Sequence, residues 1–140
     1  MIVALHAATG AATGALTGSR GAALAIGPLL HIAGDRVPHR HPAHSAWEYV
    51  SGIAAIGILT RRRGAFDAAT LGAAAAMMPD LEHVLLGGRR RGAKVFHRRP
   101  GRDRTDSTGF SVRAQTLLAL LILLPLLAVR TREARAPIPA

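Results

Sequence analysis

The apolar residues of this chain are mainly alanine and leucine, and this restricts the folds that it can adopt. Hydrophobic residues make up 49% of the 140 residues, enough for a core, but aromatic residues make up only 4%. A β-sheet would favour valine, isoleucine, tyrosine and phenylalanine. Alanine and leucine are strong helix formers, and the 15 glycines allow helices to approach closely. We therefore expect a single all-α domain.

Five segments are expected to form helices. They cover residues 2–18, 21–37, 45–60, 66–78 and 114–129. In the first segment Gly10, Gly14 and Gly18 recur every four residues, which would place them on one helix face, suited to close contact with another helix. The alternative is a flexible segment of glycine, alanine and threonine. Pro28 predicts a kink in the second helix, and Pro79 interrupts the chain after the fourth.

The net charge of +10 comes almost entirely from arginine, and the arginines occur in runs. The runs lie at residues 61–63, 89–104 and 130–135. Basic runs beside apolar segments are typical of the cytoplasmic flanks of membrane helices. The first residues contain neither a basic stretch nor a clean apolar core before a cleavage site, so we expect no signal peptide. These features predict a compact helical membrane bundle of about five helices in contact with lipid.

The expected domain covers residues 1–130, and residues 131–140 are expected to be a disordered tail. A membrane-spanning helix needs about 20 apolar residues. Only residues 114–129 approach that length, and the other segments carry histidine or aspartate. Such side chains are costly in lipid unless they face the interior of a bundle, where they mark function. We therefore expect a polar centre inside the bundle.

Histidines and acidic residues gather in two short clusters with helical spacing. The first cluster comprises His31, Asp35, His39, His41, His44 and Glu48, and the second comprises Asp80, Glu82 and His83. Neutral imidazole and carboxylate are ligands for divalent zinc, manganese or iron, and the absence of cysteine excludes thiolate sites. We expect a divalent metal, zinc first, bound by His31, Asp35, His44, Glu48, Asp80 and His83, with His6 and His39 as secondary ligands.

The first cluster has a functional and a structural interpretation. His31 with Asp35 and His44 with Glu48 are both i, i+4 pairs, and two such pairs can hold two ions that share a bridging water. In the alternative interpretation, Asp35 begins a turn, Glu48 caps the third helix, and the histidines are exposed in a loop. The histidines at positions 39 and 41 compete for one role, and either can be a bystander.

The second cluster also leaves alternatives open. Asp80 and His83 lie one helical turn apart, and Asp80 is expected either to bind the metal or to hold a ligating histidine. The alternative is an acid that stabilises the first turn of a helix through its dipole. Glu82 points to a different side of that helix and, with Glu48, is a candidate catalytic base. His6 alone is a weak signal.

The PDLEH sequence, the following FHRR and TDS, and the long apolar helix after them resemble a known family. It is the LexA-binding, YdjM-like group of bacterial inner-membrane metal-dependent hydrolases, whose pattern is an early histidine, PDxDH and HRG-THS. His6 matches the early histidine, Asp80 and His83 match PDxDH, and His97 with Arg98 match the HR pair. Two positions depart from the pattern, Glu82 for the middle aspartate and Asp106 for the second histidine of THS.

A second, partial resemblance lies in the first cluster. HxxxD, then His41, then HxxxE is similar to the ligand order of zinc-dependent phospholipase C and the S1/P1 nucleases, with a shorter spacing between the pairs. Those proteins are all-helical and hold a zinc cluster. Together the resemblances imply a helical metal-dependent hydrolase in the bacterial inner membrane.

The expected function is therefore a membrane-bound hydrolase in which a metal-activated water attacks a phosphoester or a lipid-like ester. The arginines at 89–104 would attract an anionic substrate. They can also be a solvated loop beside anionic lipid, which we favour for residues 96–107. The alternative class is a non-enzymatic membrane scaffold with a structural metal or none. Nucleic-acid binding is disfavoured, because one tryptophan and one tyrosine offer little surface for stacking with bases.

Overall fold

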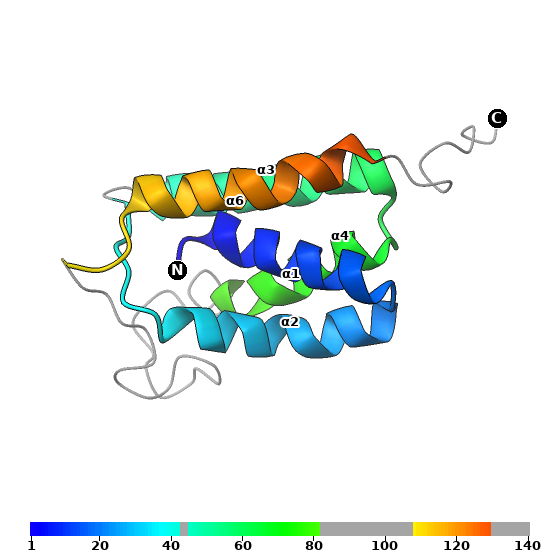
Figure 1. Cartoon of the computed structure of the whole chain (residues 1–140), viewed down its shortest axis with the longest axis horizontal. Helices are drawn as coiled ribbons and strands as arrows, with labels where there is room; N and C mark the ends of the chain where they lie inside the picture. Colours follow the sequence, from blue (N-terminus) through cyan, green and yellow to red (C-terminus); the bar gives the residue numbers. More distant parts are fainter. Residues whose placement is uncertain (43–44, 82–107, 130–140) are drawn as a thin grey trace.

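Helices form nearly all of the part of the chain that the structure describes, residues 1–42, 45–81 and 108–129 (Figure 1). The structure is a computed structural model. Its elements are α1 (Val3–Thr17), α2 (Arg20–Asp35), α3 (Ser45–Arg63), α4 (Ala68–Met77), the short 3-10 helix η1 (Met78–Asp80) and α6 (Val112–Ala128). The described residues contain no strand. The all-α prediction is therefore confirmed.

The central helix of the bundle is α1, which contacts α2, α3, α4 and α6. In Figure 1, α3 and α6 run along one side of α1, and α2 runs along the other, with α4 packed against both α1 and α2. Small and aliphatic residues of α1 and α4 dominate the core, among them Leu5, Ala8, Ala11, Ala69 and Ala73. The predicted packing of small-residue helices is what the structure shows.

The contact between α1 and α4 depends on glycine. A Cβ atom on Gly10 would collide with the backbone carbonyl of Gly72, and a Cβ on Gly14 would collide with the backbone of Ala68. The predicted glycine face of α1 is therefore a helix contact at these two positions. Gly18 has another role, because it ends the helix with a φ of 60° and its N–H donates to the Gly14 carbonyl at 2.9 Å.

Several helix ends differ from the prediction by one to three residues, and side-chain contacts explain the end of α3 and the start of α4. The α3 helix continues to Arg63, whose guanidinium donates to Asp67 Oδ1 at 2.9 Å and to the carbonyl of Leu126 in α6 at 3.3 Å. The α4 helix begins at Ala68 and not at residue 66, because the Asp67 side chain caps it by accepting from Ala69 N–H at 2.9 Å. Asp67 thus pairs with the last residue of α3 and caps the start of α4.

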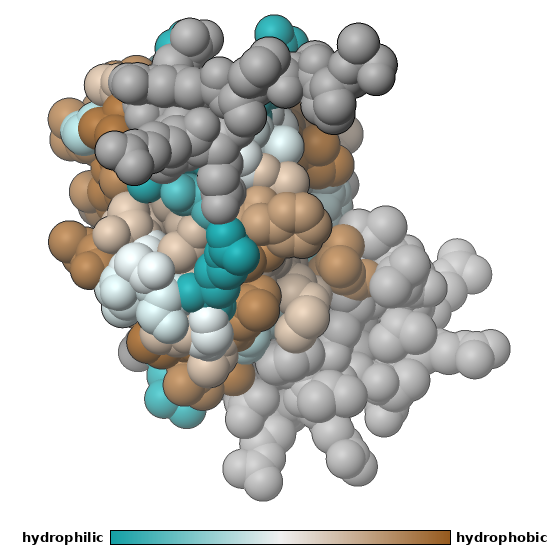
Figure 2. Space-filling model, turned by 90° about the vertical axis from the view of Figure 1, so that its right-hand side faces the viewer, coloured by the Kyte–Doolittle hydropathy of each residue, from teal (hydrophilic) through white to brown (hydrophobic). Residues whose placement is uncertain are grey.

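Large apolar side chains are exposed along α3 and α6. They include Val50, Ile53, Leu117, Leu121 and Leu124, each with at least half of its surface exposed. Apolar side chains are also exposed at the end of the molecule in Figure 2, on either side of a polar strip. No helix in the described ranges has both the length and the apolar character needed to cross a membrane. The prediction of membrane-spanning helices is therefore not confirmed.

Candidate metal centre

Four ionisable side chains meet at one end of the bundle, and we call them the inner cluster. His6 lies in α1, His31 and Asp35 lie in the second half of α2, and Asp80 ends η1. Their side chains are 0%, 1%, 8% and 15% exposed, in that order. Removing a charged group from water is very costly unless a partner compensates. The arrangement of these four groups is therefore decided by their contacts with one another.

Asp35 holds the two histidine rings of the inner cluster together. Its Oδ1 lies 3.0 Å from His6 Nε2, and its Oδ2 lies 3.0 Å from His31 Nε2. The two rings stack with their centroids 3.9 Å apart. Asp80 Oδ1 lies 3.7 Å from His31 Nε2. One ligand atom each of His6, His31 and Asp80 lies within 4.8 Å of the others, close enough for all three to bind one metal ion.

The orientation of His31 is typical of a metal ligand. Its Nδ1 lies 2.8 Å from the carbonyl oxygen of Ala76, one of the last carbonyls of α4, which have no partner within the helix. Because a carbonyl only accepts, Nδ1 carries the hydrogen and donates it. The other ring nitrogen, Nε2, faces the carboxylates of Asp35 and Asp80 at 3.0 and 3.7 Å. Metal-binding histidines usually donate their second N–H to such an oxygen.

His6 is held in the neutral form that can bind a metal. Burial lowers the pKa of His6 from 6.5 to about 3, with the hydrogen bond to Asp35 opposing this and the nearby His31 adding to it. The Nδ1 atom of His6 is buried and has no hydrogen-bond partner among the residues that the structure describes. A buried ring nitrogen in that state is uncommon. It lies beside the side chains of His31 and Asp80, with which His6 is close enough to bind one metal ion.

The shifted pKa of His6 predicts that the fold loses stability in acid. The unfolded chain binds a proton at His6 below pH 6.5, whereas the folded chain does so only near pH 3. The free energy of unfolding should therefore fall as the pH decreases from 6.5 toward 3. In the His6→Gln variant this slope should be smaller by up to about 1.4 kcal/mol per pH unit. Urea unfolding of both proteins across this range measures the difference, and equal slopes would contradict a neutral buried His6.

A second group of side chains, the outer cluster, lies beside the first and comprises His39, His41 and Glu48. The Nε2 atoms of the two histidines are 3.0 Å apart. His41 Nδ1 lies 2.7 Å from Glu48 Oε1, and His39 Nδ1 lies 2.7 Å from the carbonyl oxygen of Val37. His39 is 0% exposed, whereas the His41 side chain is 32% exposed. The outer cluster therefore connects the interior with the surface.

The amino group of Met1 joins the two clusters. It lies 2.7 Å from Asp35 Oδ1 and 2.8 Å from His39 Nε2. An ammonium group has only donors, so both the carboxylate and the imidazole nitrogen act as acceptors toward it. The inner and outer clusters are thus parts of one hydrogen-bonded network.

Gln115, which is not among the predicted site residues, holds together the segments around this network. Its Oε1 accepts from the N–H of Ile2 at 2.9 Å, and its Nε2 donates to the carbonyls of Arg40 and Phe110, both at 2.8 Å. It is 0% exposed. Its position in the sequence could have identified it as buried and hydrogen-bonded, because it is a polar amide at the start of the most apolar segment, where an unsatisfied amide would be costly. The loop with His39 is also paired directly with Phe110 through two backbone hydrogen bonds.

The structure brings together predicted residues from both sequence clusters. His6, His31, Asp35 and Asp80 meet in the inner cluster, and His39 and Glu48 lie in the outer cluster. His39 and His41, which were expected to compete for one role, lie side by side. The interpretation of these histidines as exposed loop residues is wrong for His39, which is fully buried.

Other predicted site residues lie outside the described residues. They are His44, Glu82, His83, His97, Arg98 and Asp106, together with the basic segment 89–104 and the tail 131–140.

Asp80 faces His31 from another helix, so its position involves more than the helix dipole. The Glu48 side chain lies within hydrogen-bonding distance of His41, at 2.7 Å.

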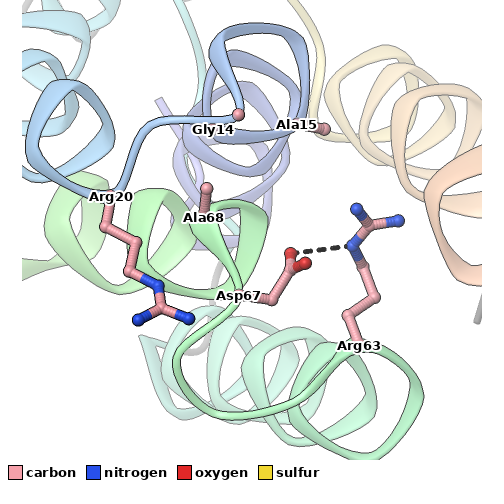
Figure 3. Close-up of a pocket in the computed structure, with 7 residues that line it drawn as sticks. Gly14, Ala15, Arg20, Arg63, Asp67 and Ala68 are labelled. Carbon is pink, nitrogen blue, oxygen red and sulfur yellow. Dashed lines mark hydrogen bonds and ion pairs between the residues drawn. The ribbon is translucent and has the colours of Figure 1, made fainter. Parts of the chain in front are cut away.

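A small cleft lies at the opposite end of α1 and α4 (Figure 3). It has a volume of about 170 Å³ and is lined by Gly14, Arg20, Arg63, Asp67 and neighbouring small residues. Figure 3 shows the ion pair between Arg63 and Asp67 on its wall, with the two groups 2.9 Å apart. Because Asp67 is buried to a similar degree as Asp80, it provides a control acid far from the centre.

Comparisons of the chain with protein-family models, with curated proteins and with solved structures find no match. The resemblance to the YdjM-like hydrolases stays a prediction. The structure establishes that three residues lie close enough together to bind a metal ion: His6, His31 and Asp80.

Proposed function

We propose that the protein is a metal-dependent hydrolase that acts on a phosphoester or a lipid-like ester, with zinc as its metal. The observation that carries the proposal is the environment of His31. Its Nδ1 lies 2.8 Å from a backbone carbonyl, and its Nε2 faces two carboxylates in the interior, at 3.0 and 3.7 Å. A positive ion at that position would compensate both carboxylates and complete the coordination of the ring.

The donor set fits a catalytic rather than a structural zinc site. His6, His31 and Asp80 supply three ligands, and catalytic zinc sites typically have three protein ligands and keep the fourth position for water. When bound, the ion would lower the pKa of that water, so that the water can act as a nucleophile near neutral pH. Asp35 holds both imidazole rings through its two oxygens, so it orients the ligands. Of the predicted bases, Glu48 belongs to the outer cluster and contacts His41.

The surface supports an association with a bacterial inner membrane. Exposed leucine, isoleucine and valine side chains along α3 and α6 form apolar surface of the kind that marks a partner or a membrane. The net charge of +10 favours contact with anionic lipid head groups and attracts an anionic phosphoester. The YdjM-like resemblance points to the same location.

A comparison of two aspartates tests the proposed function. Asp80→Asn should lower both the zinc bound per chain and the hydrolysis of a phosphodiester such as bis(p-nitrophenyl) phosphate, because it removes one ligand. Asp67→Asn removes a similarly buried carboxylate at the far end of the bundle and should leave both unchanged in the folded fraction. Both variants are measured in detergent with added zinc, and a chelator should abolish the activity.

The result can also favour the alternative of a non-enzymatic scaffold. Zinc binding that Asp80→Asn abolishes, without turnover of phosphodiester, phospholipid or carboxylic ester, would leave a structural metal. Equal zinc content in the wild type and both variants would contradict the inner cluster as the metal site.

A further inference from the structure

The outer cluster brings two imidazole Nε2 atoms to one place. His39 Nδ1 lies 2.7 Å from a backbone carbonyl, which only accepts, so this nitrogen carries the hydrogen. His41 Nδ1 lies 2.7 Å from the carboxylate of Glu48 and is oriented by it in the same way. With both rings neutral, the two Nε2 atoms would be the nitrogens that can bind a cation, and they lie 3.0 Å apart.

The spacing of the two Nε2 atoms fits a shared metal ion. Two imidazole nitrogens that bind one zinc ion at about 2.0–2.1 Å lie roughly 2.9–3.4 Å apart for octahedral to tetrahedral angles. The observed separation is 3.0 Å. The opposite nitrogen of each ring contacts an oxygen, from Val37 in one case and from Glu48 in the other. This pairing of a ligand nitrogen with an outer oxygen acceptor is the usual arrangement around metal-binding histidines.

Positive charge is stabilised beside this pair. The amino group of Met1 contacts both His39 Nε2 and Asp35 Oδ1, so an imidazole and a carboxylate converge on one positive group. The same Asp35 oxygen contacts His6 in the inner cluster. Asp35 therefore lies between the two clusters and can compensate a cation on either side.

We propose that His39 and His41 bind a second divalent cation through their Nε2 atoms, with Asp35 between this ion and the one at the inner cluster. Glu48 is a positioning residue that acts through His41. The inference rests on the proposed function and deepens it. Two neighbouring ions are typical of enzymes that cleave phosphoesters, because they stabilise both the attacking and the leaving oxygen. A second ion therefore favours a phosphoester over a carboxylic ester as the substrate class.

Metal stoichiometry tests the second site. The wild-type protein in detergent is loaded with Zn²⁺, freed of excess metal and analysed for zinc per chain. We expect two ions in the wild type, and one in His41→Ala, whose side chain is partly exposed and is expected to tolerate replacement. Glu48→Gln should retain the second ion with an affinity lower by about 10–100-fold. Thr116→Val, a change in α6 outside both clusters, is the control and should keep both ions.

Loading with Co²⁺ gives a readout that does not depend on activity. Visible absorption should increase in two steps in the wild type, and the step of the outer site should be absent in His41→Ala. One ion per chain in both proteins would overturn the second site and leave the proposed function standing. Two ions in both would show that the second ion binds elsewhere, which also overturns it. No bound ion in the wild type would overturn the inference and the proposed function together.

Discussion

Replacement of His31 by leucine should lower the affinity of the inner cluster for zinc by at least about 100-fold. His31 contacts Asp35 and Asp80 with one nitrogen and the Ala76 carbonyl with the other, so it lies at the centre of the inner cluster. Leucine fills a similar volume and cannot bind a metal. The change therefore removes the ligand with little change in packing.

The expected result for His31→Leu can be read from thermal or urea unfolding with and without zinc. Zinc at 100 times its dissociation constant stabilises the wild type by about 2.7 kcal/mol. At the same concentration a 100-fold weaker site gains only about 0.4 kcal/mol. Thr70→Val is a suitable control, because Thr70 lies buried in α4 and its hydroxyl has no hydrogen-bond partner within the described part of the chain. An equal zinc effect in His31→Leu and in the control would exclude His31 as a ligand.

Replacement of Gly14 by alanine should destabilise the fold by about 2–3 kcal/mol. Its new Cβ would collide with the backbone of Ala68, and neither backbone can move without separating α1 from α4. Because α1 contacts every other α-helix of the described chain, the shift would disturb the whole bundle. The loss is expected even though alanine is intrinsically better than glycine in a helix by up to about 1 kcal/mol.

Gly57→Ala is the matched control for Gly14→Ala. Gly57 lies inside α3, and a Cβ atom added there would meet no atom of the described residues within 4 Å. The same substitution should therefore stabilise the protein by up to about 1 kcal/mol. Unfolding followed by circular dichroism measures both variants. Similar stabilities for the two would mean that the glycine contact between α1 and α4 is not formed.

The helices could be predicted from the sequence because local properties determine them. Alanine and leucine favour helix throughout, and Gly18 stops α1 by itself, through its conformational freedom. The end of α3 could not be predicted in the same way. Arg63 stays helical while it contacts Asp67 and the carbonyl of Leu126, and the second partner lies 63 residues away in the chain.

The candidate centre was predictable only where its residues are close in the sequence. The i, i+4 spacing of His31 and Asp35 predicted their contact, which the structure shows at 3.0 Å. His6 and Asp80 come from other helices, and their approach depends on how α1, α2 and α4 pack. The pairing of His39 with His41 depends on the loop conformation, which hydrogen bonds to Phe110 hold. Such pairing has no periodicity from which it could be read.

The inner cluster also has a consequence for the order of events in folding. Its contacts join residues that are far apart in the sequence: His6 and Asp35 are separated by 29 positions, and His31 and Ala76 by 45. These contacts form only after three helices have packed, so the unfolded chain offers no assembled site to an ion. An ion that binds there would leave the rate of folding unchanged and would slow unfolding, because its ligands must separate before the helices do. The metal would then give the folded bundle kinetic stability, and it would not nucleate folding.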